Sequence, residues 1–232
     1  MMVEVVLLVK KPIIVIEHLE PCLSPWILSE YRFVSKLFGK NRLIFTNVKN
    51  SKSQEVLLKL GNVYSGRFID IFRDITKKSI VLDPQAKLPL RRAEVLRADA
   101  IIIGGIMGDH PPRGRTYKFI TKEAVKAGAL ARNLGSEQLT IAGAAYVIKI
   151  IEEGFELNDI KIMKGLRIEL ELSRGIKLEL YLPYAFPLRN GKPVVPEDYI
   201  DTIIRKSTVF EQYLLSESIE CYPGKESNGN IH

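Results

Sequence analysis

The sequence has few of the residues that build metal sites and disulfide frameworks. Its two cysteines, Cys22 and Cys221, lie near opposite ends of the chain, and one of its three histidines, His232, is the last residue. No Cys-x-x-Cys or His-x-His pair occurs, so we expect neither structural zinc nor a catalytic metal. Two incidental thiols are typical of a reducing compartment, and we therefore expect a cytoplasmic protein.

Long apolar runs are also missing. The apolar residues 5–9 follow Glu4 and precede Lys10 and Lys11, which is the reverse of the charge order in a secretory signal peptide. No apolar stretch approaches the roughly 20 residues that a membrane-spanning helix requires. We therefore expect a soluble protein that has no membrane partner.

The common nucleotide-binding patterns do not occur. The segment from Gly104 to Gly108 lacks the Gly-x-Gly-x-x-Gly spacing of dinucleotide sites, and no Gly-Lys-Ser or Gly-Lys-Thr of a phosphate-binding loop follows it. Dinucleotide and triphosphate sites of these types are therefore disfavoured.

Short β-branched runs alternate with amphipathic stretches along most of the chain. We expect buried strands at residues 13–16, 43–45, 80–82 and 100–103, a weak strand around Leu130, and helices at residues 24–37, 53–61, 116–127 and 140–153. This alternation predicts an α/β protein with a mostly parallel sheet and helices on both faces.

The last third of the chain changes character. Residues 166–172 and 176–180 alternate apolar and polar side chains and flank Ser173-Arg174-Gly175, which predicts a small antiparallel hairpin within residues 160–183. A final helix is expected from Pro196 to beyond Ile204. The polar residues 216–232 predict a flexible tail.

The densest group of unusual residues follows the predicted strand at 100–103. Residues 104–116 read Gly-Gly-Ile-Met-Gly-Asp-His-Pro-Pro-Arg-Gly-Arg-Thr. Open α/β sheets bind ligands at the carboxyl ends of their strands, where glycines let a ligand approach the backbone closely. Arg113 and Arg115 supply positive charge for an anion. A tight turn with solvated arginines accounts for only part of this segment.

Two further segments carry weaker signals. Residues 134–140 precede a helix whose first turn could receive an adenosyl group or simply be capped by Thr140. Glu17, His18 and Glu20 follow the first strand and offer carboxylates and an imidazole. A single histidine in a loop is more often a hydrogen-bonding residue than a catalyst, so both interpretations stay open.

These segments, in this order along the chain, resemble a branch of the SPOUT methyltransferases. The resemblance rests on residues 16–20 (Ile-Glu-His-Leu-Glu), Trp26, Glu30-Tyr31, Leu82-Asp83-Pro84, residues 104–116 and residues 134–140. The branch comprises predicted RNA methyltransferases and a eukaryotic enzyme that methylates an arginine of a ribosomal protein. The resemblance covers residues 12–205, which we expect to form one domain, with 1–11 as an N-terminal extension and 206–232 as a helix end and tail.

The resemblance implies a C-terminal trefoil knot whose loops hold S-adenosylmethionine. By the resemblance, the cofactor-binding residues are Leu82, Asp83, Pro84, Gly104, Gly105, Gly108, Leu134, Gly135, Gln138, Leu139 and Thr140. The expected catalytic residues are Asp109, Glu17, His18, Arg113 and Arg115. The carboxylates, with Glu20, suit a cationic arginine substrate, whereas the two arginines suit the phosphates of RNA.

The charge distribution leaves the substrate class open. The 34 Lys and Arg residues exceed the 27 Asp and Glu residues, which gives a net charge of +7, and between Gln85 and Gly135 ten basic residues face four acidic ones. An anionic surface such as rRNA is therefore favoured, although solvated helix faces explain many such residues. We expect methylation of an arginine in a ribosomal protein, with rRNA or tRNA methylation as the alternative and non-catalytic RNA or nucleotide binding as the third. A monomer and a homodimer are both compatible.

Overall fold

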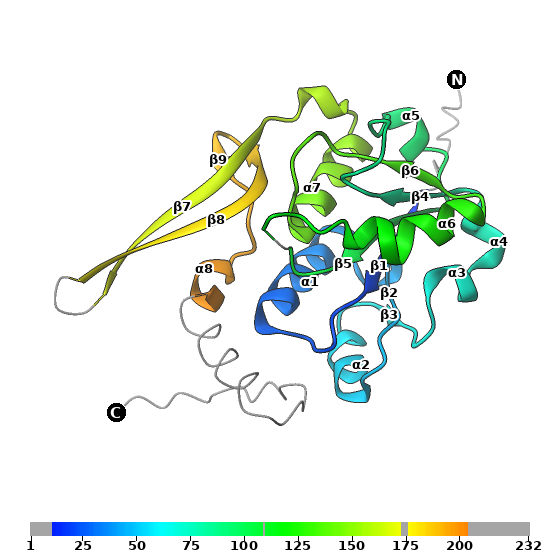
Figure 1. Ribbon diagram of the computed structural model, residues 1–232, viewed down its shortest axis with the longest axis horizontal. Helices are drawn as coiled ribbons and strands as arrows, with labels where there is room; N and C mark the ends of the chain where they lie inside the picture. Colours follow the sequence, from blue (N-terminus) through cyan, green and yellow to red (C-terminus); the bar gives the residue numbers. More distant parts are fainter. Residues whose placement is uncertain (1–10, 109, 173–175, 204–232) are drawn as a thin grey trace, which may run out of the picture.

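A twisted parallel sheet forms the centre of the main body in the computed structural model, which describes residues 11–108, 110–172 and 176–203 (Figure 1). The six-stranded sheet has the order β3-β2-β1-β5-β4-β6, and every pair in it is parallel. Its strands are β1 (Ile13–His18), β2 (Leu43–Thr46), β3 (Asn62–Val63), β4 (Ser79–Leu82), β5 (Ala100–Gly105) and β6 (Leu130–Arg132). The predicted α/β class is confirmed.

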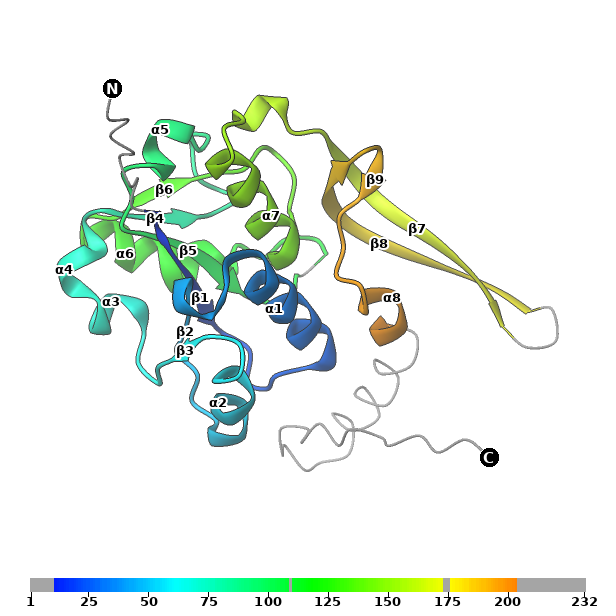
Figure 2. The same cartoon turned by 180° about the vertical axis from the view of Figure 1, so that it is seen from behind.

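Two long helices, α1 and α7, lie against one face of this sheet (Figure 2). The helices are α1 (Pro25–Phe38), η1 (Lys40–Arg42), α2 (Ser51–Leu57), α3 (Phe68–Ile71), α4 (Arg73–Thr76), α5 (Arg92–Val95), η2 (Tyr117–Thr121), α6 (Lys122–Lys126), α7 (Ile141–Glu152), η3 (Leu157–Asp159) and α8 (Tyr199–Asp201). Helix α1 begins where predicted because the Ser24 side chain accepts a hydrogen bond from the Ile27 amide at 3.2 Å. Helix α2 begins earlier than predicted because Asn50 caps it.

Alternating side chains of the strands divide the interior into two cores. Ile14, Ile16, Ile101 and Ile103 pack with α1, α2, α5 and α7, while residues between them, such as Ile102, pack with α3, η2 and α6. Successive residues of a strand point to opposite faces of the sheet, so a continuous apolar run supplies both cores. Helices therefore cover both faces, as predicted.

A long antiparallel ribbon projects from the α/β body (Figures 1 and 2). Strands β7 (Ile162–Leu172) and β8 (Ile176–Arg189) pair in the predicted hairpin, which is longer than expected, and β9 (Lys192–Pro193) adds a short third strand. The base of the ribbon is tied to the body because the Ala185 amide donates to the Gln138 carbonyl at 2.9 Å. A separate apolar cluster includes Leu182, Phe186 and Tyr199.

The segment before α8 is fastened to α1 by polar contacts. Ser29 donates a hydrogen bond to Asp198 at 2.5 Å, and Lys36 pairs with Glu197 at 2.7 Å. The ring of Trp26 meets the ring of Tyr199 edge-on, with centroids 5.5 Å apart. These contacts bring the C-terminal part of the described chain against the first helix.

Several expectations concern residues outside the described ranges. These are most of the N-terminal extension at 1–11, the hairpin turn at 173–175, and the helix end and tail from residue 204 onward. The cysteine expectation needs a correction, because Cys22 is disulfide-bonded and is therefore not an incidental thiol. Cys221 lies outside the described residues. Within the described residues, no helix has the length and apolar character of a membrane span.

A buried ion pair joins the amino end of β1 to the end of α7 and gives a stability test. Arg42 contacts Glu152 at 2.5 Å and also donates to the Pro12 carbonyl at 2.8 Å, and the Glu152 side chain is only 1% exposed. Arg42→Ala should lower the free energy of unfolding by about 3 kcal/mol, because it leaves a buried carboxylate without its cation. Urea denaturation measures the change.

The matched control removes an exposed pair. Lys36→Ala should cost less than about 1 kcal/mol, because both Lys36 and Glu197 are well exposed. Equal losses in the two variants would show that the Arg42 pair contributes no more than a surface contact.

Candidate functional site

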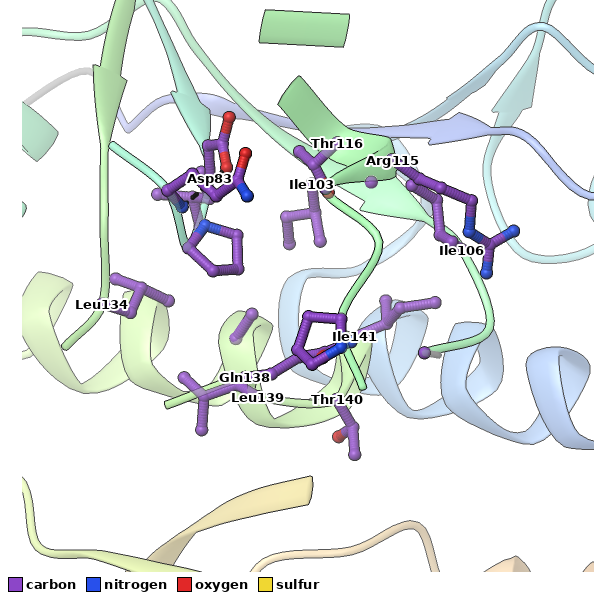
Figure 3. Close-up of a pocket in the computed structure, with 18 of the residues that line it drawn as sticks. Asp83, Ile103, Ile106, Arg115, Thr116, Leu134, Gln138, Leu139, Thr140 and Ile141 are labelled. Carbon is purple, nitrogen blue, oxygen red and sulfur yellow. Dashed lines mark hydrogen bonds between the residues drawn. The ribbon is translucent and has the colours of Figure 1, made fainter. Parts of the chain in front are cut away.

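Three loops at the carboxyl edge of the sheet enclose a pocket of about 130 Å³ (Figure 3). The loops follow β4, β5 and β6, and the first turn of α7 closes the pocket. All but two of the expected cofactor-binding residues line it: Leu82, Asp83, Pro84, Gly104, Gly108, Leu134, Gln138, Leu139 and Thr140. The loops lie up to 50 residues apart in sequence and meet because parallel strands end at one edge.

The lining is largely apolar, with a few polar groups between the loops. Ile103, Ile106 and Leu139 contribute hydrocarbon, and Ala144 on α7 leaves room beside them. Arg113 and Gln138 supply hydrogen-bonding groups. Such a pocket suits a flat apolar group with a polar edge, which backbone amides and carbonyls can read.

Asp83 holds the first loop in place. Its carboxylate is 2% exposed and accepts hydrogen bonds from the Gln85 amide at 2.8 Å and from the Thr121 hydroxyl at 2.6 Å. Its own amide donates to the Arg132 carbonyl at 2.9 Å, which joins the loops after β4 and β6. Asp83 therefore fixes the geometry of the pocket through contacts within the protein.

The second loop is held by an ion pair that the sequence pattern does not reveal. Glu20 accepts hydrogen bonds from the Met107 amide and from Arg115, both at 2.9 Å, and Arg115 also donates to the Met107 carbonyl. The Tyr184 hydroxyl on β8 donates to the Gly108 carbonyl at 2.6 Å. Arg115 thus serves to lock this loop, whatever it does for a substrate. Asp109 lies outside the described residues.

Gly105 and Gly135 are the two expected cofactor residues that do not line the pocket. A Cβ on Gly105 would lie 2.9 Å from Cγ2 of Ile16 and still closer to the Tyr31 hydroxyl. The glycine is therefore needed for the close approach of α1 to the sheet. Gly135 has φ of +107°, which a turn requires and which other residues rarely adopt.

Glu17 and His18, at the end of β1, do not line the pocket, and their side chains contact different elements. Glu17 accepts hydrogen bonds from the Phe68 amide at 2.9 Å and from Thr46, and burial raises its pKa. His18 shares a hydrogen bond of 2.8 Å with the Tyr31 hydroxyl, and burial lowers the pKa of His18 to about 4. His18 is therefore neutral at pH 7. A catalytic part for either residue stays a prediction.

A second, smaller pocket adjoins the first and contains Glu30, a residue of the family motif to which the sequence analysis gave no role in the site. Glu30 on α1 lines it together with Trp26, Tyr184 and Tyr199. The sequence feature that indicates a special role for Glu30 is its position on the apolar face of α1, one turn after Ile27, where a carboxylate is unusual. Among the described residues, no three His, Cys, Asp or Glu side chains gather as metal ligands would.

The comparisons with known proteins identify the family. The family model described as "Protein arginine N-methyltransferase SFM1-like" matches residues 13–209. The chain belongs to this family. It is 28% identical over 207 residues to the protein arginine N-methyltransferase SFM1 of Saccharomyces cerevisiae, which covers 83% of this chain and 94% of the relative. The predicted family resemblance and the predicted methyltransferase class are therefore confirmed.

Solved structures of SFM1-like relatives share the fold. The yeast arginine methyltransferase SFM1 complexed with SAM aligns with a TM-score of 0.72 and 28% identity, covering 86% of this chain and 92% of the other. The same enzyme complexed with SAH gives a TM-score of 0.69 at 28% identity, covering 82% and 94%. A dual specific Trm10 from Thermococcus kodakaraensis gives 0.51 at 21% identity, covering 64% and 96%, and supports the fold alone. The trefoil knot itself stays a prediction.

Gly105 gives a test that separates packing from ligand binding. Gly105→Ala should lower the free energy of unfolding by about 1–3 kcal/mol, because the new methyl group overpacks the contact with Tyr31 and Ile16. Gly104→Ala is the matched neighbour, and its nearest atoms would lie at 3.2–3.5 Å, so a smaller loss is expected. Thermal denaturation compares the two. A Gly105→Ala protein of unchanged stability with no cofactor affinity would instead place Gly105 in the pocket.

Proposed function

We propose that this chain transfers a methyl group from S-adenosylmethionine to an arginine side chain of a ribosomal protein. The observation that carries the proposal is the pocket formed by the loops after β4, β5 and β6, in a chain of the SFM1-like family. The yeast relative is named a protein arginine N-methyltransferase, and its structures contain SAM or SAH. A ribosomal protein that is bound to its rRNA would also suit the basic surroundings of the site, because the rRNA is anionic.

The residues of the pocket fit the proposed cofactor. Leu82, Ile103 and Leu139 offer apolar surface for an adenine ring, and backbone groups of the three loops can read its edge. S-adenosylmethionine supplies a methyl group that is already activated by its sulfonium. The main task of the chain is therefore to position the acceptor nitrogen and to exclude water.

An arginine acceptor must lose one proton when its nitrogen takes the methyl group. We propose that Asp109 and Arg113 contact the substrate, because both belong to the loop that follows β5 and Arg113 lines the pocket. A carboxylate can orient a guanidinium and receive its proton. In this proposal Arg115 acts indirectly, by keeping the loop in place through Glu20.

The RNA alternative draws on the positive charge around the site, and the third possibility is binding without catalysis. Ten basic residues lie between Gln85 and Gly135, and several of them are exposed. We propose the cytoplasm as the compartment, because a ribosomal substrate is found there. Because Cys22 is disulfide-bonded, its thiol gives no support for a reducing compartment. A monomer or a homodimer remains the proposed assembly.

The cofactor proposal predicts direct binding without a metal. Titration calorimetry of the purified chain with S-adenosylmethionine or S-adenosylhomocysteine in the presence of EDTA should give saturable heat. ATP and NAD serve as controls and should give none, because the chain lacks their common loop patterns. If the chain bound ATP or NAD but neither S-adenosylmethionine nor S-adenosylhomocysteine, it would be a nucleotide-binding protein and the proposal would be wrong.

The substrate proposal predicts which macromolecule receives the methyl group. The chain is incubated with ribosomes and S-adenosylmethionine that carries a labelled methyl group, and the product is treated with nuclease or with protease. Label that survives nuclease and is released by protease, and that is recovered as methylarginine after hydrolysis, supports the proposal. Label lost to nuclease alone would establish the RNA alternative, and any transfer would exclude a purely binding role.

A further inference from the structure

The second pocket shares a wall with the first. Ile106, Thr140 and Ile141 line both pockets, so a group in the second would lie beside a ligand in the first. The remaining lining residues of the second pocket are Trp26, Ile27, Glu30, Met107, Tyr184 and Tyr199. Three aromatic side chains and one carboxylate are thus the main chemical groups.

The carboxylate of Glu30 is buried without a cation. Its residue is 3% exposed, and among the described ion pairs no lysine or arginine contacts it. Glu30 accepts a hydrogen bond from the Ala142 amide of α7 at 2.5 Å. Thr140 accepts from the next amide, that of Gly143, at 3.0 Å, so each of the two acceptors satisfies one amide at the start of α7. Capping requires only an acceptor, as the neutral Thr140 hydroxyl shows, and does not require a carboxylate. A buried carboxylate is costly unless something positive pairs with it.

The hydroxyl of Tyr199 is a second unsatisfied group in the same pocket. Tyr199 is fully buried, and its hydroxyl has no hydrogen-bond partner among the described residues. Glu30 and Trp26 both interact with the Tyr199 side chain, although no described group has the geometry of a full hydrogen bond to its hydroxyl. Buried polar groups are normally paired, so this hydroxyl is suited to hydrogen-bond a ligand, and it can accept from one that carries only donors.

The aromatic rings complete the walls of the pocket. Trp26 and Tyr199 meet edge-on at 5.5 Å, with 87° between their planes. Tyr184 comes from β8 and is fixed through its hydrogen bond to Gly108. Aromatic faces attract planar cations, and guanidinium stacks on them better than ammonium does.

We infer that the second pocket binds the guanidinium group of the substrate arginine, with Glu30 as its counter-ion and the Tyr199 hydroxyl as an acceptor. The inference rests on the proposed function and assigns the acceptor side of that site. It places the acceptor next to the shared wall of Ile106, Thr140 and Ile141. It gives roles to Trp26, Glu30 and Tyr199, which the cofactor pocket does not need.

Binding should depend on pH through Glu30. Burial raises the pKa of Glu30 to about 7, so the carboxylate is protonated and neutral in acid. A cation binds the ionised form, so affinity should rise between pH 6 and pH 8. The other titratable groups facing this region are Tyr31, Tyr184 and Tyr199, with Glu20 near Tyr31. Burial raises the pKa of both Tyr31 and Tyr199, so these two stay neutral over this range.

The chain contains a single tryptophan, Trp26, which lies in this pocket and can report on it directly. The experiment titrates the full chain with methylguanidinium chloride and follows tryptophan fluorescence, with methylammonium chloride at equal ionic strength as the reference. We expect a saturable change with methylguanidinium that is at least tenfold weaker with methylammonium. Circular dichroism at each concentration confirms that the protein stays folded.

Two variants and one control decide the assignment. Glu30→Gln should weaken methylguanidinium binding at least tenfold and abolish its pH dependence, whereas Glu153→Gln, on an exposed site at the end of α7, should change neither. Tyr199→Phe removes an unpaired hydroxyl, so it should not lower stability and should weaken binding about fivefold, the scale of one hydrogen bond. If Glu30→Gln does not fold, Tyr199→Phe decides.

Wild-type affinity in a folded Glu30→Gln protein, or in Tyr199→Phe where Glu30→Gln does not fold, would overturn the inference. Equal responses to methylguanidinium and methylammonium would do the same. The titration needs neither cofactor nor methyl transfer. A chain that binds methylguanidinium but methylates only RNA would therefore retract the proposed function and keep the cation site. A chain that methylates arginine but does not bind methylguanidinium would keep the proposed function and overturn the cation site.

Discussion

The close contact between Tyr31 and Gly105 is the constraint on which both pockets depend. Because position 105 has no side chain, α1 lies directly on the end of β5, with the Tyr31 hydroxyl against the strand and hydrogen-bonded to His18. The neighbouring positions on α1 then point where they are needed. Glu30 reaches the start of α7, and Trp26, one turn earlier, reaches Tyr199. A bulkier residue at 105 would lift all three from their partners.

The three glutamates of this region have different environments although they lie within 14 residues. Glu17 is satisfied by a backbone amide and a hydroxyl, and Glu20 pairs with Arg115. Glu30 has hydrogen-bonding partners but no described cation. The difference arises from what faces each glutamate. Glu17 faces the start of α3, Glu20 faces the loop that contains Arg115, and Glu30 faces the aromatic second pocket. All three carboxylates connect parts of the structure, and Glu30 is the one for which we propose an additional cationic partner.

The sequence predicted the features that arise from local patterns and did not predict those that arise from distant contacts. Strands β1, β4 and β5 follow from apolar runs, and α1 and α7 from caps at Ser24 and Thr140. The family resemblance implied that three loops share one cofactor site, which agrees with the rule that ligands bind at the carboxyl ends of parallel strands. By contrast, Gly105 was assigned to the ligand because only the fold shows that Tyr31 occupies its space. Glu30 belongs to the family motif, but its place beside the pocket was not predicted because its partner, Ala142, lies more than 100 residues away.

The protein surface and the second pocket carry charges of opposite sign, and the surface charge acts over a longer distance. The net charge of +7 and the basic residues between Gln85 and Gly135 favour approach to an anionic surface, with an effect that salt screens over roughly 10 Å. Inside the second pocket the charged side chain is the carboxylate of Glu30, which acts only at contact and is shielded from salt by burial. A nucleic acid would satisfy the surface but not this pocket. A ribosomal protein on its rRNA would satisfy both, because the rRNA meets the basic surface while an arginine enters the pocket.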